Sequence, residues 1–301
     1  MMRAHWRENM FNHGRWEGPI LDQHMHLDRN NRYLSAISEF INSGGTAINL
    51  VHKPNFSDLP STISDYQLAY DDTIDMAREI REKFGIKVSV ILGPHPVSWE
   101  KQVHTIGLQE STSLHLQAVK LAIKYISSGE AVCLGEVGRP HYPVSLEIWD
   151  AANDLLLEIM KLAAEAKISI QLHVEDDGEK TYSDLAKLCD MASLPRHLAI
   201  RHYAPANIDS EFTHGLSVTV SVGKDSISKI VESLPNCNSY WGMETDYLDD
   251  KNRPGAVLGP KTIPKRTNQL IEKLGKSGYS EEEINDIVEN IHSKWPQILY
   301  S

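Results

Sequence analysis

The sequence predicts an α/β protein with a TIM-like (β/α)8 barrel, and three observations support this prediction. Short apolar, β-branched runs alternate with longer segments of helical period along almost the whole chain. There are eight such runs, which is the number of strands in this barrel. The chain has 301 residues, enough for a barrel of about 250 residues with additions at its ends. Because periodicity does not show whether a sheet closes, an open, doubly wound sheet is the alternative.

The eight predicted strands are short and rich in Val, Ile, Leu and Ala. They cover residues 20–24, 47–52, 87–92, 131–136, 168–173, 198–202, 217–220 and 240–246. The segments between them predict helices, of which residues 146–166 show the clearest pattern. Apolar side chains recur there at spacings of three and four and so form one stripe, and Ser145 is well placed as the N-cap. Segments 66–83 and 114–126 show similar patterns.

Both ends of the chain extend beyond the predicted barrel. Residues 1–18 form an arm before the first strand, and residues 19–301 are expected to make one barrel domain, since no linker or change of composition divides them. The segment Ser280-Glu-Glu-Glu283 is a capping box, in which a Ser side chain and a Glu three residues later satisfy each other's backbone amides. It predicts an extra C-terminal helix that runs to about Ser293.

The composition limits the classes of protein to which the chain can belong. It has 30 Lys and Arg against 41 Asp and Glu, a net charge of −11, which argues against sequence-independent binding to DNA or anionic lipid. No segment approaches the roughly 20 apolar residues of a membrane span, and the first 15 residues lack the apolar run of a secretory signal. The three cysteines are far apart in sequence, which makes a disulfide framework improbable and favours a cytoplasmic location.

Histidine is the unusual residue, with 14 in the chain against five Phe. Several histidines and two carboxylates are found at the carboxyl ends of predicted strands: His24, His26, Glu136, His173, His202 and Asp246. Alternate residues of a strand point to the same face, so the two histidines of the H-x-H pair project together. In a barrel the carboxyl ends of the strands converge on one mouth, where the active sites of this fold lie. We therefore expect these six side chains to meet in space.

Such a ligand set is typical of a metal-dependent hydrolase. Three or four His and carboxylate ligands suit Zn²⁺ or a similar divalent ion. Six ligands around a central carboxylate suit two ions about 3.5–4 Å apart, here bridged by Glu136 and a water whose pKa the ions lower towards about 7. Taken singly, each residue could also have a purely structural role. His202 could be a core histidine that donates to a carbonyl group, and Glu136 could be a buried ion-pair partner. The coincidence of all six with strand ends favours the metal site.

The order of the motifs resembles the TatD family of metal-dependent hydrolases, in the amidohydrolase superfamily. The resemblance covers residues 20–295 and includes a closing helix of the pattern S-x-E-E … N at residues 280–290. The matching blocks are His24-Met-His26, Gly93-Pro-His95-Pro96, Gly135-Glu-Val-Gly138, Gln171-Leu-His173, Arg201-His202 and Glu244-Thr-Asp246.

The resemblance implies a TIM-like barrel with two divalent ions, which can be Zn, Mn, Mg or Ni. It also implies hydrolysis of phosphodiester bonds of DNA, commonly as a 3′-exonuclease. Carried over residue by residue, it assigns one ion to His24, His26, Glu136 and Asp246, and the other to Glu136, His173 and His202. Asp246 would also orient the attacking water and accept its proton. His95 would face the leaving group or a phosphate oxygen, with a role in fixing the turn as its structural alternative.

The sequence departs from the family pattern at two places. The family usually has an arginine two residues after the fifth-strand histidine, where this chain has Glu175, followed by Asp176 and Asp177. After G-E-x-G the chain continues with Arg139, which is either a replacement phosphate contact or a structural ion-pair partner. In the cationic loop 248–266, Lys261 and Arg266 are further candidates for substrate contact, with a solvated surface as the alternative.

These departures leave the metal site intact but keep three functions open. The first is hydrolysis of DNA, and the second is metal-dependent hydrolysis of another bond: a lactone, an amide, another phosphoester or the ester of a D-aminoacyl-tRNA. The expected partner is accordingly a nucleic acid or a small anionic ester, and not a membrane. The third is a barrel that binds metal or nucleic acid without turnover, which the presence of all six ligands disfavours.

Overall fold

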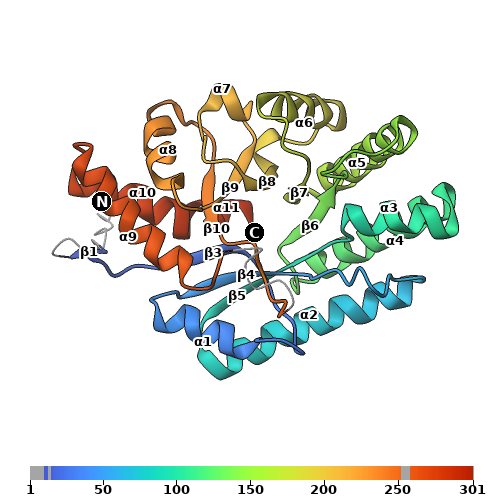
Figure 1. The fold of residues 1–301 in the computed structure, drawn as a ribbon, viewed down its shortest axis with the longest axis horizontal. Coiled ribbons are helices and arrows are strands. Elements are labelled where there is room, and N and C mark those ends of the chain that lie inside the picture. The colour runs from blue at the N-terminus through green and yellow to red at the C-terminus, as the bar shows by residue number, and fades with distance from the viewer. Residues whose placement is uncertain (1–9, 13–14, 252–257, 301) are drawn as a thin grey trace, which may run out of the picture.

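The computed structural model describes residues 10–12, 15–251 and 258–300 and contains a main sheet of parallel strands surrounded by helices (Figure 1). The strand order is β10-β9-β8-β7-β6-β5-β4-β3-β11. The strands are β3 (Leu21–His26), β4 (Ala47–Val51), β5 (Lys87–Leu92), β6 (Cys133–Gly138), β7 (Ile170–His173), β8 (Ala199–Ala204), β9 (Ser217–Ser221), β10 (Trp241–Glu244) and β11 (Tyr247–Leu248). All eight predicted strands are present, with ends within about two residues of the predicted ones.

The two ends of this sheet meet, which the sequence pattern left open. β10 pairs with β9, whereas β11, which follows after Thr245 and Asp246, pairs in parallel with β3. β10 also lies against β3, because a Cβ atom at Gly242 would come 2.0 Å from Nε2 of Gln23. The carboxylate of Asp22 in β3 accepts hydrogen bonds from both the backbone N and the hydroxyl of Thr245. The sheet therefore curls round until β10 returns beside β3, which gives the predicted TIM-like fold.

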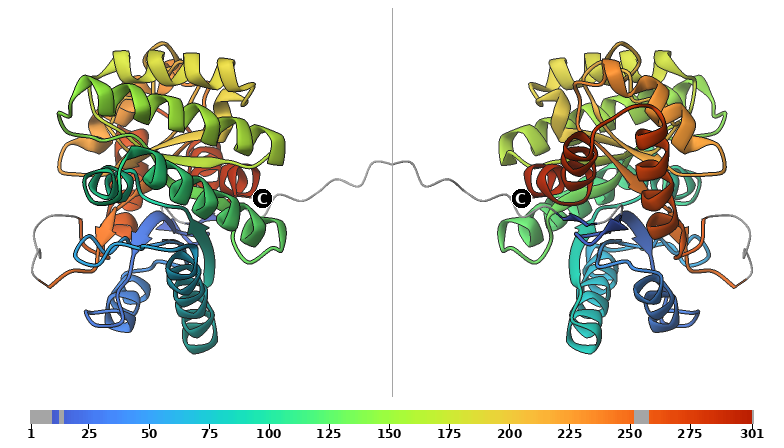
Figure 2. Two further views of the ribbon diagram at one scale, coloured as in Figure 1. Left: turned by 90° about the vertical axis from the view of Figure 1, so that its right-hand side faces the viewer. Right: turned by 90° about the vertical axis from the view of Figure 1, so that its left-hand side faces the viewer.

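The helices cover the outside of the sheet, as two perpendicular views show (Figures 1 and 2). They are α1 (Leu34–Asn42), α2 (Ile63–Phe84), α3 (Pro96–Ile106), α4 (Leu108–Ser127), α5 (Leu146–Ala166), α6 (Glu179–Ala192), α7 (Ser210–Thr213), α8 (Ser226–Ser233) and α9 (Thr262–Lys276). The helix predicted at residues 146–166 is confirmed, and the Ser145 hydroxyl caps it by accepting from the backbone N of Ile148. α2 and α4 extend a few residues beyond their predicted ends.

The C-terminal segment begins as predicted and then packs beneath the barrel. Ser280 and Glu283 form the expected capping box at the start of α10 (Glu281–Glu289). The chain continues through a π-helical turn (Asn290–Lys294) into α11 (Trp295–Leu299). In the turn, His292 Nδ1 accepts from the backbone N of Leu21, at the start of β3. This segment covers the end of the barrel opposite the carboxyl ends of the strands.

The described part of the N-terminal arm contains a short antiparallel pair, β1 (Phe11–Asn12) and β2 (Arg15–Trp16). The backbone N of Met10 donates to Asn285 of α10, so the arm lies against the C-terminal helices. The rest of the predicted arm, residues 1–9 and 13–14, lies outside the described residues. None of the described helices is both long and apolar enough to cross a membrane.

Candidate metal centre

All six predicted ligands lie together at the carboxyl ends of the barrel strands. His24 and His26 belong to β3, Glu136 to β6, His173 to β7 and His202 to β8, while Asp246 stands between β10 and β11. The side chains from β3, β6 and β8 are buried, whereas those of His173 and Asp246 are 19% and 22% exposed. The mouth therefore combines a buried floor of ligands with two members that solvent can reach.

The carboxylate of Glu136 lies at the centre and faces two different pairs of histidines. Its Oε2 is 3.3 Å from Nε2 of His26 and 3.8 Å from Nε2 of His24. Its Oε1 is 2.9 Å from Nδ1 of His173 and 2.7 Å from Nε2 of His202. On the first side, Oδ1 of Asp246 is 3.6 and 3.7 Å from the same nitrogens of His26 and His24. This is the arrangement expected of a carboxylate shared by two cation sites.

A glycine allows the strands that carry this cluster to approach each other. Gly138 ends β6 with φ +154°, and a Cβ atom there would come 1.9 Å from the carbonyl oxygen of His173 in β7. Any other residue would push the two strands apart. The second glycine of the G-E-x-G block thus keeps Glu136 within reach of His173.

The hydrogen bonds identify which ring nitrogens are available as ligands. Nδ1 of His26 lies 3.1 Å from the carbonyl oxygen of Val51, an acceptor, so Nδ1 carries a proton and Nε2 is the nitrogen turned to the mouth. Two further pairs of ring nitrogens face each other, His24 with His26 at 3.1 Å and His173 with His202 at 3.0 Å. Lone pairs and carboxylates that converge in this way fit divalent cations such as Zn²⁺, with His and carboxylate as its common ligands.

The electrostatics of the cluster also call for positive charge. Burial opposes protonation of His26, but its hydrogen bonds with Asp246 and Glu136 outweigh this and raise its pKa to about 10. Burial likewise opposes protonation of His202, yet Glu136 raises the pKa of His202 well above its usual value. Burial alone would raise the pKa of Glu136, but the neighbouring histidines hold it well below its usual range. Divalent ions would replace these protons, so metal binding at neutral pH releases protons.

Glu244 is a member of the centre that the strand-end argument did not identify. It is fully buried, and its Oε1 and Oε2 lie 3.4 Å from Nδ1 of His202 and 4.0 Å from Nδ1 of His24. The two imidazoles are stacked with centroids 4.3 Å apart. Glu244 also accepts a 2.6 Å hydrogen bond from the backbone N of Tyr203. It therefore lies behind one histidine of each predicted ion site, with its carboxylate facing the Nδ1 side of both rings.

We expect Glu244→Gln to weaken metal binding without removing a ligand. An amide lacks the negative charge that Glu244 places behind both imidazole rings, and loss of such an outer contact costs about 10–100-fold in metal affinity. Titration of Mn²⁺ or Zn²⁺ into the metal-free variant and wild-type proteins measures the change. Glu158→Gln on the exposed face of α5 is the matched control, with no change expected. Equal affinity of Glu244→Gln and wild type would contradict the positioning role.

His95 fixes the turn before α3, and its ring also faces the mouth. It is the N-cap of α3, and its Nδ1 accepts from the backbone N of Val97 at 3.1 Å. Burial, followed by the neighbouring His173, lowers the pKa of His95 well below its usual value, so the ring is neutral. The proton is then on Nε2, which lies 3.9 Å from Oε1 of Glu136. His95 thus presents a hydrogen-bond donor, and not a lone pair, to the mouth.

A second residue that sequence reasoning missed is His141. Its Nδ1 lies 2.7 Å from Nε2 of His173, so it contacts the side of that ring turned away from Glu136. His141 lies on the loop after β6, in the segment that departs from the family pattern. Because His141 lies outside the predicted strands, the strand pattern does not identify it. The one signal in the sequence is its position two residues after Arg139, within the segment that departs from the family pattern.

Arg139, a predicted substrate contact, is placed as a buried ion-pair partner. Its guanidinium forms a bidentate pair with Glu175, with Nε at 2.8 Å from Oε2, and donates to Asn153 at 2.7 Å. It also stacks on the ring of Trp149 and is only 2% exposed. Arg139 and Glu175, the two residues that depart from the family pattern, therefore neutralise each other's charge. This ion pair favours the structural alternative for Arg139.

The other two substrate candidates make contacts away from the ligands. Lys261 pairs with Glu39 of α1 at 3.2 Å, and Arg266 donates to the carbonyl oxygen of Val222 and to Gln269. Within the described part of the chain, no contact joins either side chain to the six ligands. The central part of the cationic loop, residues 252–257, lies outside the described residues.

Comparisons with known proteins agree with this fold. Residues 21–295 match the model of a family described as TatD related DNase. An uncharacterized protein of Methanocaldococcus jannaschii is 28% identical over 258 residues, 85% of this chain and 88% of its own length. An uncharacterized metal-dependent hydrolase of the same organism is 23% identical over 266 residues, 86% of this chain and 96% of its own. The crystal structure of YjjV, a TatD homologue from Escherichia coli, has a TM-score of 0.60 and 16% identity, with 93% and 97% of the two chains covered.

Proposed function

The chain belongs to the family of TatD-related DNases, whose members are metal-dependent hydrolases, and we propose that it hydrolyses phosphodiester bonds at the 3′ ends of DNA with two divalent ions. One observation carries the proposal: the two oxygens of Glu136 face two separate groups of ligands. His24, His26 and Asp246 on one side of Glu136, and His173 and His202 on the other, would hold two ions. These ions would supply an activated water and positive charge for a phosphate, which is the chemistry that phosphodiester hydrolysis requires.

Two side chains of the protein supply the proton transfers and orientation. Asp246 lies at the exposed edge of the cluster, and its carboxylate accepts the proton of the attacking water. The backbone of Asp246 is held at φ +48°, a costly conformation for a residue other than glycine. Such conformations are frequent at functional sites. From the opposite side, Nε2–H of His95 donates a hydrogen bond to a phosphate oxygen or to the leaving oxygen.

The acidic run after β7 does not oppose a phosphate substrate as strongly as its sequence suggests. Glu175 is paired with Arg139, Asp176 with Arg201 at 3.0 Å, and Asp177 with Lys180 at 3.0 Å. Each of the three carboxylates thus has its own cation. This pairing supports DNA as the substrate despite the missing arginine.

A second candidate is metal-dependent hydrolysis of a lactone, amide, other phosphoester or D-aminoacyl-tRNA ester. It is compatible with the aromatic rim of the mouth, where the ring of Phe56 packs edge-on against His95 at 5.2 Å. Phe56 is 42% exposed and Tyr203, next to His202, is 55% exposed. These rings suit a planar base or an apolar acyl group equally well.

A direct assay separates the two candidates. Purified protein loaded with Mg²⁺, Mn²⁺ or Zn²⁺ is incubated with a 5′-labelled single-stranded oligonucleotide and, in parallel, with lactone, amide and carboxylic ester substrates. The proposal predicts a ladder of products shortened from the 3′ end. Hydrolysis of a lactone, amide or carboxylic ester with an intact oligonucleotide would establish the second candidate instead.

We expect His95→Asn to lower kcat about 10²–10³-fold while the metal content stays unchanged. Asn keeps an oxygen that can cap α3 but loses the Nε2–H that faces the mouth, and one such donor is worth about this factor. His95→Ala should show the same loss together with about 0.5–2 kcal/mol lower stability, because the cap is lost as well. Steady-state kinetics and thermal unfolding separate the two effects. A normal kcat in His95→Asn would assign His95 to the turn alone.

A further inference from the structure

A hollow of about 590 Å³ opens beside the metal centre, at the carboxyl ends of β8 and β9. Its lining includes Arg201, Tyr203, Ser221, Lys224, Ser226 and Lys229. Tyr203 directly follows the ligand His202 in β8, so the hollow adjoins the mouth. We propose that this hollow binds a phosphate group of the substrate other than the one that is cleaved. The inference rests on the proposed phosphodiesterase function.

The guanidinium of Arg201 has hydrogen-bonding capacity that the protein does not use. Arg201 is 1% exposed, and its Nη2 donates to Oδ1 of Asp176 at 3.0 Å and to the carbonyl oxygen of Glu175 at 3.2 Å. Its Nε and Nη1 are buried and have no hydrogen-bond partner among the described residues. Unpaired buried donors on a charged group are costly. Packing of the guanidinium on the ring of Tyr182 at 4.7 Å fixes its plane, so an anion that enters the hollow meets a preformed donor.

The segment after β9 adds backbone donors and charge to the same hollow. It runs from Ser221 through Gly223 and Lys224 to Ser226, the first residue of the eight-residue helix α8. The side chain of Asp225, at the N-cap, makes no capping hydrogen bond, so the first-turn amides of α8 are not capped by it. Uncapped amides and the helix dipole favour an anion at this position. β9 is the seventh strand of the barrel, and the loop after this strand often holds phosphate in barrels, which is an analogy at the level of the fold.

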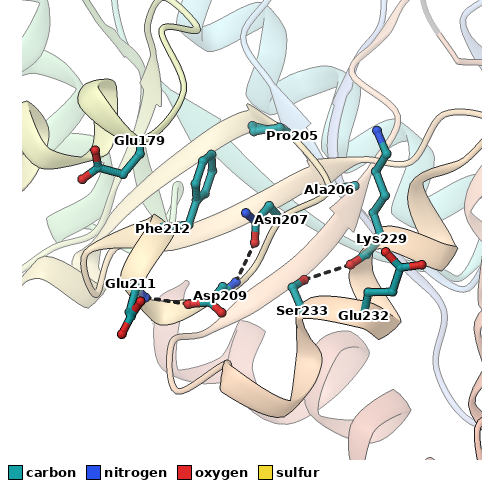
Figure 3. Close-up of a pocket in the computed structure, with 10 residues that line it drawn as sticks. All are labelled: Glu179, Pro205, Ala206, Asn207, Asp209, Glu211, Phe212, Lys229, Glu232 and Ser233. Atoms are coloured by element: carbon teal, nitrogen blue, oxygen red, sulfur yellow. Dashed lines mark hydrogen bonds between the residues drawn. The ribbon is translucent and has the colours of Figure 1, made fainter.

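The charges around the hollow favour an anion over a cation. Arg201, Lys224 and Lys229 contribute three positive charges against the carboxylates of Asp176 and Asp225. Within the described residues, neither lysine forms an ion pair. A neighbouring hollow of about 940 Å³ is different, since it is lined by four carboxylates, Glu179, Asp209, Glu211 and Glu232, with Lys229 as its cation (Figure 3). Figure 3 shows the Lys229 side chain extending away from Asp209 and Glu211.

Phosphate fits this set of donors better than a carboxylate does. The guanidinium, the two ammonium groups and the helix amides approach from β8, the β9–α8 loop and α8, and a tetrahedral phosphate has oxygens to meet donors from several directions. A DNA strand carries a phosphate at every nucleotide, so one held in the hollow would fix the chain while its neighbour occupies the metal centre. Such positioning lowers the entropy cost of reaction.

The test uses the double variant Lys224→Gln/Lys229→Gln of the full-length, metal-loaded protein, with Lys161→Gln on exposed α5 as the matched control. Isothermal titration calorimetry with inorganic phosphate should show one binding event fewer in the double variant than in the wild type and the control. In kinetics, the ratio of kcat/KM for a trinucleotide to that for bis-p-nitrophenyl phosphate, which has one phosphate, should fall about tenfold in the double variant. The control should keep the wild-type ratio.

Identical phosphate titrations of wild type and double variant would overturn the inference, as would an unchanged kinetic ratio. Circular dichroism and thermal unfolding check that the double variant is folded, and both lysines lie at the surface hollow, where substitution leaves the core intact. If the wild type cleaves neither phosphodiester, the proposed function fails, while the phosphate titration still decides whether the hollow binds this anion.

Discussion

Glu136→Gln is expected to yield a folded protein that binds fewer than two divalent ions per chain and has lost its hydrolytic activity. Glu136 is the one ligand that faces both groups of histidines, and a neutral amide cannot donate two anionic oxygens to two ions. Loss of an outer contact alone costs about 10–100-fold in metal affinity, so loss of the shared ligand should cost more than about 100-fold. Elemental analysis after dialysis measures the ions, and the oligonucleotide assay measures the activity.

Glu130→Gln supplies the control for this variant, because it exchanges the same groups at an exposed position just before β6. It should retain the full metal content and rate. Two tightly bound ions in Glu136→Gln would contradict a bridging carboxylate, whatever its effect on the rate.

Asp246→Asn is expected to lower kcat about 10²–10⁴-fold, the usual contribution of a general base. Asn keeps an oxygen in the position of Oδ1, near His24 and His26, but it cannot accept the proton of the attacking water. The metal content should therefore fall less than in Glu136→Gln, while the rate falls steeply. Single-turnover kinetics with saturating Mn²⁺ separates chemistry from metal loss.

Asp184→Asn on the exposed face of α6 is the control and should be as active as the wild type. Activity of Asp246→Asn within a few-fold of wild type at saturating Mn²⁺ would remove Asp246 from the proton transfer and transfer that role to another group of the mouth.

Features that depend on local periodicity were predictable from the sequence. The strand β5 and the helix α5 have the predicted bounds, because alternation of apolar and polar segments and a capping serine fix them locally. The six ligands followed from the same pattern, since a side chain at the carboxyl end of a parallel strand must face the mouth in a barrel. That these six side chains meet was therefore predictable before their distances were known.

Features that depend on contacts between distant segments were not predictable. Closure of the sheet requires β11 to pair with β3, more than 200 residues earlier, and no local pattern encodes that pairing. Glu244 belongs to the Glu244-Thr-Asp246 motif, but its position behind His24 and His202 depends on the packing of β3, β8 and β10 against one another. Likewise, only the fold shows that Arg139 is paired with Glu175, and the sequence by itself left its role open.

The C-terminal helix shows the same limit on a smaller scale. Its capping box predicts the start of α10 correctly, but the helix does not run uniformly to Ser293. It changes to a π-helical turn from Asn290, in which the buried His292 contacts both Leu21 and Thr267. π-helical turns are rare interruptions of α-helices, and the sequence of this helix alone does not reveal one.

We expect this mouth to hold two divalent ions on opposite sides of one carboxylate, that of Glu136. Anomalous diffraction from crystals of the protein grown with Mn²⁺ tests it most directly. Two anomalous peaks are predicted, one between Glu136 and the histidines of β3, and one between Glu136, His173 and His202. A single peak, or peaks that leave Glu136 without an ion on one of its sides, would contradict the account.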